Sequence, residues 1–202
     1  MKFLKYFHIL PLFLLLSCST NSGKDSNEKT ISAINQTNFR QFIRKFKVLS
    51  LPLTINTDEI QATSSLKRLN EKDNTFINSE YPNEIWSYGL LPDTSKTYKI
   101  IWLAPAEMLV PVLTTFSKKG QRINEQYLGV GGCGSDCCFW CKESIKINQD
   151  MTIYSVDSIR SCECDSIGPK ENTMKKYIRF MTGKVSGNGK IKMTEIIEQR
   201  VN

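Results

Sequence analysis

The feature that most constrains this fold is a group of six cysteines in the second half of the chain. Four of them occupy the stretch 133–141, and two more follow about twenty residues later. Bonds among them would hold these two segments together. Three kinds of chemistry use cysteines at such spacings: a metal site, a thiol redox site and structural disulfides. The six are Cys133, Cys137, Cys138, Cys141, Cys162 and Cys164.

The amino-terminal residues bear on this choice because they predict the compartment. Lys2 and Lys5 precede an apolar block at 9–16, and Ser17 and Cys18 follow it. A charged start, a short apolar block and a small residue before a cleavage site are typical of an export signal. The block is about half the ~20 apolar residues of a membrane-spanning helix, so we expect no permanent span here.

The end of this signal, Leu15-Leu16-Ser17-Cys18, resembles the lipobox of bacterial lipoproteins. The resemblance implies cleavage before Cys18, a diacylglycerol group on its sulfur, and a further acyl chain such as palmitate on the new amino terminus. Two or more acyl chains hold a protein stably on a membrane. The implied location is the cell envelope, and Ser19 in place of Asp indicates the outer membrane by family analogy. The alternative is a plain signal peptide with an incidental cysteine.

The remaining chain divides at about residue 34. Residues 18–34 contain few apolar side chains, which predicts a lipidated cysteine followed by a flexible tether. Residues 35–202 are enough for a single domain. Once residues 1–17 are removed, 25 basic residues stand against 20 acidic ones, with no run of five or six like charges. This mild excess gives no support for a nucleic-acid partner.

The domain is expected to begin with one short amphipathic helix. Phe39, Phe42, Ile43 and Phe46 recur at helical spacing, after polar residues that suit a helix cap. Such a helix packs its apolar face on a sheet or lies on a membrane surface, and the first arrangement is the commoner one. A second short helix is possible after Thr57.

Strand patterns dominate the rest of the domain. The β-branched and aromatic run 98–103 predicts a strand, and three later pairs of runs are joined by polar or Gly-containing turns. These observations predict a mainly β fold, with α+β as the alternative, built as an antiparallel β-meander of hairpins with a disulfide-stapled loop. The three pairs are 108–116 with 122–130, 144–147 with 152–159, and 175–185 with 190–197.

The chemistry that the chain lacks is informative. Its one histidine, His8, lies in the segment that the signal cleavage removes, so His-dependent catalytic and metal sites are excluded from the mature chain. The 129–134 stretch fits G-x-G-x-x-G, but a cysteine-rich loop follows it where a dinucleotide fold needs a helix. Ser64 and Lys67 fit S-x-x-K without its companion motifs. Two carboxylates brought together by folding could still serve a glycan hydrolase.

The cysteines themselves favour disulfides. Once Cys18 carries lipid, an even number remains, and exported thiols meet an oxidising compartment. Cys138 and Cys141 have the C-x-x-C spacing of zinc knuckles and redox sites, but no helical pattern follows and no second such pair exists. Neighbouring Cys137 and Cys138 are too close to bond each other. We therefore expect Cys162 and Cys164 each to reach into 133–141, where the other two close a small ring.

The predicted function is a non-enzymatic, lipid-anchored envelope protein with a binding or structural role, no cofactor, and an unknown protein or glycan ligand. Two alternatives stay open: a metal-binding or thiol-redox module on the 133–164 cysteines, and a histidine-free, carboxylate-dependent glycan hydrolase. Exposed aromatic rings offer flat contact area for a ligand, although they also pack at domain edges. The candidate contact residues are Phe139, Trp140, Tyr81, Trp86 and Tyr88.

Overall fold

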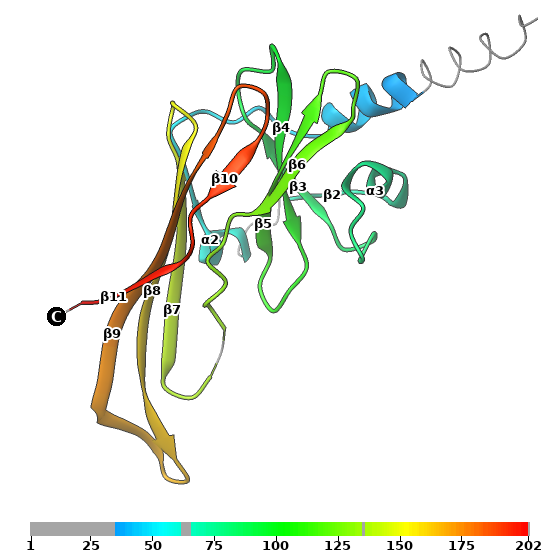
Figure 1. The fold of residues 1–202 in the computed structure, drawn as a ribbon. Coiled ribbons are helices and arrows are strands. Elements are labelled where there is room, and N and C mark those ends of the chain that lie inside the picture. The colour runs from blue at the N-terminus through cyan, green and yellow to red at the C-terminus, as the bar shows by residue number, and fades with distance from the viewer. Residues whose placement is uncertain (1–34, 62–65, 135, 202) are drawn as a thin grey trace, which may run out of the picture. The chain divides into compact units, whose positions relative to one another are not determined.

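The computed structural model describes residues 35–61, 66–134 and 136–201. The predicted signal, Cys18, the tether and Ser64 lie outside these residues. Residues Asn35–Asn202 form one compact unit, which is mainly β with antiparallel sheets, as the sequence predicts (Figure 1). Its elements are β1 Leu53–Asn56, α2 Thr57–Gln61, β2 Lys67–Arg68, α3 Glu71–Ile77, β3 Trp86–Leu90, β4 Thr97–Ala104, β5 Val110–Ser117, β6 Arg122–Tyr127, β7 Phe139–Ile147, β8 Thr152–Asp165, β9 Gly168–Val185, β10 Ile191–Met193 and β11 Ile197–Arg200.

Within the described residues, the strands are divided between two sheets, where the sequence predicted one meander. Sheet A has the order β2-β3-β4-β5-β6, and sheet B has the order β1-β7-β8-β9-β10, with β11 also paired to β9. Each sheet is built mainly from consecutive hairpins. The chain leaves sheet A at β6 and enters β7 through the glycine- and cysteine-rich stretch 128–138, so this stretch separates the two meanders.

The three predicted hairpins are all present. β5 pairs with β6, β7 with β8, and β9 with β10. Their turns use backbone conformations that suit glycine, such as Gly120 at φ 87° and Gly189 at φ 86°. β8 and β9 are longer than predicted and continue past the start of β7 as an exposed ribbon at one end of sheet B (Figure 1).

The first hydrophobic core lies between the helices and one face of sheet A. Residues 35–43 are helical, and all four residues of the predicted stripe, Phe39 to Phe46, are buried in this core. They contact side chains of β4 and β5, including Ile100 and Phe116. The helical segment therefore packs on a sheet.

The second core lies between the other face of sheet A and the inner face of sheet B. Ile101 and Leu103 of β4 meet Ile145 and Ile153 of β7 and β8 there. Because β4 is covered on both faces, its residues 100–104 are continuously apolar instead of alternating. The layer order is thus helices, sheet A, sheet B.

Two short helices complete the unit. α2 begins at Thr57, where the sequence permits it. α3 was not predicted, because its buried positions are too few and unevenly spaced. Its start is marked by a capping box, in which the Asn70 side chain accepts from the Asp73 backbone N–H and the Asp73 side chain accepts from the Asn70 N–H. Among the described residues, no helix is long and apolar enough to cross a membrane.

Candidate functional site

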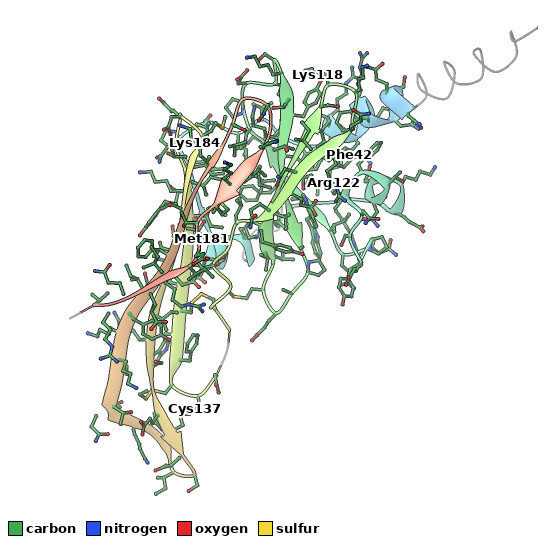
Figure 2. All side chains as sticks on the ribbon, in the orientation of Figure 1. Phe42, Lys118, Arg122, Cys137, Met181 and Lys184 are labelled. Atoms are coloured by element: carbon green, nitrogen blue, oxygen red, sulfur yellow. A yellow bond between two sulfur atoms is a disulfide. The ribbon has the colours of Figure 1, made fainter. Side chains whose placement is uncertain are left out.

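Three disulfides fasten the segment before β7 to the end of sheet B. Cys137 bonds Cys164, and Cys138 bonds Cys162. The other two, Cys133 and Cys141, close a ring between positions eight residues apart. Cys162 and Cys164 each reach into 133–141 and the other two cysteines close a ring, as expected, while the choice of partners comes from the structure. Figure 2 shows Cys137 near one end of sheet B and Lys184 near the other end.

These bonds occupy all the sulfur atoms of the cluster. Cys133 Sγ, Cys141 Sγ and a carboxylate oxygen of Asp157 lie within 4.8 Å of one another. The two sulfurs are bonded to each other, however, and a disulfide sulfur does not carry the thiolate charge that zinc requires. In a C-x-x-C redox site Cys138 and Cys141 would bond each other, whereas here each of them bonds a different cysteine. The bridged cluster fits neither the metal nor the thiol-redox alternative.

A pair of buried carboxyl groups, which the sequence analysis did not single out, lies next to the Cys133–Cys141 ring. Glu143 on β7 and Asp157 on β8 are register partners, and the two residues are 6% and 0% exposed. The 129–134 loop covers them with its backbone. The Val130 N–H donates to Glu143 Oε2 at 3.0 Å, and the Gly132 N–H donates to Asp157 Oδ2 at 2.9 Å. The loop and the carboxyl pair are therefore bound directly to each other.

Two glycines make this close approach possible. A Cβ atom on Gly129 would lie 2.6 Å from Glu143 Oε2, and one on Gly132 would lie 2.7 Å from Asp157 Oδ2 and 2.8 Å from Arg179 Nη1. Any side chain at either position would collide with these groups. The glycines that resemble a dinucleotide motif instead let the loop backbone rest on two acids and a guanidinium.

The environment makes Glu143 the protonated member of the pair. Burial raises the pKa of Glu143 to about 7, with a further rise from the Asp157 charge, against a lowering by backbone N–H groups of the loop. Burial also raises the pKa of Asp157, but the Gly132 N–H, Glu143 and Arg179 favour its charged form. A charge on one carboxyl opposes ionisation of the other in this buried site, so the pair holds a proton below about pH 7. One proton is accordingly shared between the two carboxyls.

An unsatisfied oxygen supports the shared proton independently. Asp157 Oδ1 is buried, and no N–H or hydroxyl group of the described residues donates a hydrogen bond to it. A proton on the Glu143 carboxyl supplies the missing donor. The pair thus acts as a hydrogen-bonded unit below the loop. A hydrolase needs two carboxyls flanking space for a sugar, and here the loop backbone fills that position, so this pair lends the hydrolase alternative no support.

The opposite, outer face of sheet B carries a concentration of cations and rings. Because side chains alternate along a strand, Trp140 and Lys142 point away from the core that holds Glu143 and Ile145. Among ion pairs of the described residues, the only one that engages a cation of this face joins Lys184 to Asp150, at 4.0 Å. We call the following set the basic face: Trp140, Lys142, Lys146, Tyr154, Arg160, Lys176, Phe180, Lys184 and Lys192.

The register aligns one row of this face across three strands. Trp140 on β7 is opposite Arg160 on β8, which is opposite Lys176 on β9. Trp140 is 57% exposed. With Lys142 and Met174, these side chains line a shallow groove of about 480 Å³. The groove offers an aromatic ring next to unpaired cations, which suits a flat, negatively charged ligand.

The other predicted contact residues lie elsewhere. Phe139 is half-buried at the start of β7, and Trp86 and Tyr88 are half-buried on β3 against the core between the sheets. Burial and Glu59 raise the pKa of Tyr88. Tyr81 is exposed and lines a separate cavity of about 270 Å³ beside sheet A. The predicted rings therefore do not form one groove.

The cations of the basic face were missed as a group, although they left a signal in the sequence. Lys142, Lys146 and Arg160 each alternate with residues that are buried on the inner face, and a period of two places them on one side of a strand. Their grouping across strands depends on pairing register, which no local pattern encodes.

No family model, curated protein or solved structure matches this chain.

Proposed function

We propose that this chain is a lipid-anchored, non-enzymatic protein of the cell envelope. It binds a ligand through a surface centred on Trp140. The anchoring part rests on the lipobox-like residues that end in Cys18. The binding part rests on one observation above the others. A large ring stays 57% exposed on a sheet face rich in cations, of which only Lys184 forms an ion pair within the part of the chain that the structure describes.

The disulfide cluster supports this assignment mechanically. Trp140 follows Cys138 and precedes Cys141, so two of the three bridges hold the chain on either side of it. A ring fixed in this way loses little conformational entropy when it binds. Preorganisation of an exposed ring is characteristic of binding sites, whereas a ring that only completes a core would be buried.

The anchor is tested by Cys18→Ala in the full chain. We expect the wild-type protein in the membrane fraction and the variant in the soluble fraction, because the variant lacks the sulfur that carries the diacylglycerol. The measurement is fractionation of expressing cells, followed by mass spectrometry of the amino-terminal peptide. Membrane retention of an unacylated variant would contradict the anchor.

The binding surface is tested on envelope fractions of the same cells. In the Cys18→Ala chain, which lacks the lipid anchor, Trp140→Ala should reduce sedimentation of the purified protein with these fractions about tenfold, since truncating a central aromatic contact commonly costs more than 1 kcal/mol. Tyr81→Ala is the matched control, because Tyr81 is equally exposed but lies beside sheet A. Equal binding by all three proteins would contradict a role for the basic face.

A further inference from the structure

The basic face lies on the outside of the layered unit. The helical segment from residue 35 packs on the side of sheet A that faces away from sheet B. The basic face is the outer surface of sheet B, and sheet A and both cores lie between it and that helical segment. It is therefore an outer surface of the unit that a ligand can reach.

The chemistry of the groove indicates the kind of molecule that fits. Neighbouring residues across antiparallel strands are about 5 Å apart, so Trp140, Arg160 and Lys176 form a short row of one ring and two cations. Lys142 lies one step farther along β7. An arginine guanidinium binds a carboxylate through two parallel hydrogen bonds, and a lysine binds it as a point charge. The tryptophan offers an apolar plane for a flat partner.

A surface that binds a protein partner would have a different residue composition. Protein interfaces usually have an apolar centre with few lysines, whereas here lysines stand among the rings over the whole face. An extended chain with alternating apolar faces and carboxylates satisfies ring and cations together. A polysaccharide with acidic sugars has this character, because each sugar ring presents a C–H face and a negative group.

From these observations we infer that the Trp140–Arg160–Lys176 groove binds an acidic glycan of the envelope space. This inference rests on the proposed binding function and specifies its partner. The ring packs on one sugar, while Arg160, Lys176 and Lys142 bind the carboxylates. All four side chains are exposed at the sheet surface, so substituting them leaves both cores intact.

The test uses the full chain with Cys18→Ala, which carries no lipid and so meets vesicles only through its protein surface, and oligogalacturonate is the probe. A neutral oligosaccharide of equal length, polyglutamate, and vesicles with anionic phospholipid serve as alternative ligands. We expect oligogalacturonate to bind at least about tenfold more tightly than the neutral sugar. Arg160→Gln with Lys176→Gln should weaken that binding about tenfold or more, in line with loss of charge-assisted contacts. Trp140→Ala should weaken oligogalacturonate binding but not polyglutamate binding.

A charge-matched control separates the groove from the overall charge. Lys176→Gln alone should weaken oligogalacturonate binding, whereas Lys119→Gln, which also removes one positive charge but in the β5–β6 turn of sheet A, should leave that binding unchanged. Preference for vesicles or polyglutamate, or equal loss with Lys119→Gln, would overturn the inference. If the chain sediments with envelope fractions through Trp140 but ignores oligogalacturonate, the acidic-glycan inference fails and the proposed binding function stands.

Discussion

The carboxyl of Glu143 couples the stability of the loop to pH. Its pKa is about 7 in the folded protein against an ordinary value of 4.5, so the folded state holds its proton more tightly than the unfolded state. This contribution to the free energy of unfolding is complete below pH 4.5 and is lost as the pH rises through about 7. We expect a loss on the order of 1–3 kcal/mol across that window.

Glu143→Gln tests this expectation, because glutamine mimics the protonated carboxyl. The variant should show a smaller decline in unfolding free energy than the wild type between pH 5 and 8, about the window that the folded and ordinary pKa values define. Denaturant unfolding at several pH values measures the difference. Glu163→Gln removes an exposed carboxyl on β8 and serves as the control. Parallel pH profiles for the wild type and Glu143→Gln would contradict a proton held by this pair.

At the scale of elements, the disulfides stabilise the junction of the pre-β7 segment with β8. The Cys138–Cys162 bridge closes a separation of 24 residues, and the Cys133–Cys141 bridge closes one of 8. Alone, loops of these lengths would contribute about 3.5 and about 2.5 kcal/mol in the loop-entropy model. The Cys137–Cys164 bridge already closes nearly the same loop as Cys138–Cys162, however, so the latter adds only a short ring. Replacing Cys138 and Cys162 by Ala should therefore lower the unfolding free energy by less than replacing Cys133 and Cys141.

Calorimetry and denaturant unfolding of the two double variants measure this order. Replacing pairs, and not single cysteines, leaves no free thiol to form a wrong bridge. The variant without Cys138 and Cys162 should also lose affinity for the probe of the Trp140 groove, since only the Cys137–Cys164 bridge then ties the chain before Trp140 to β8. An equal loss of stability in both variants would argue against loop length as the controlling quantity.

The elements show what a local pattern can predict. The three hairpins follow from turn residues and strand periodicity, and the helical stripe of Phe39 follows from its spacing, because each signal lies within a few residues. α3 has too few buried positions for a period to be visible, and only its Asn70–Asp73 cap marks it. The division into two sheets depends on which faces of β4 are covered, and that is a property of the whole chain.

The candidate site also contains features that a local pattern predicts and features that it does not. That Cys162 and Cys164 bond into 133–141 was predictable from spacing, but which of its cysteines they bond was not, because Cys133 and Cys141 were equally possible partners. The Glu143–Asp157 pair was not, because neither residue has a local signature, and only the β7–β8 register places one beside the other. Trp140 was identified as an aromatic contact, but its row with Arg160 and Lys176 also needed the register.

For the whole molecule, sheet A joins the two cores. Ile100 and Trp102 of β4 belong to the core under the helices, and Ile101 and Leu103 belong to the core between the sheets. A hydrogen bond from Thr115 Oγ1 to the Gly189 carbonyl, 2.6 Å long, also joins sheet A to the β9–β10 turn. Strands shared in this way cannot lose one core and keep the other. We therefore expect residues 35–202 to unfold as one cooperative unit.

Phe42→Ala tests this cooperativity from the helical layer (Figure 2). The ring is 1% exposed, so its removal should lower the unfolding free energy by about 3–5 kcal/mol, and Phe42→Leu should lower it less. Fluorine-labelled tryptophan reports the two cores separately, because Trp102 lies in the first core and Trp86 packs against the second. Their resonances should disappear at the same denaturant concentration in both variants. Loss of the Trp102 signal while the Trp86 signal persists would show instead that the helical layer unfolds on its own, and that sheet B with its basic face folds independently of it.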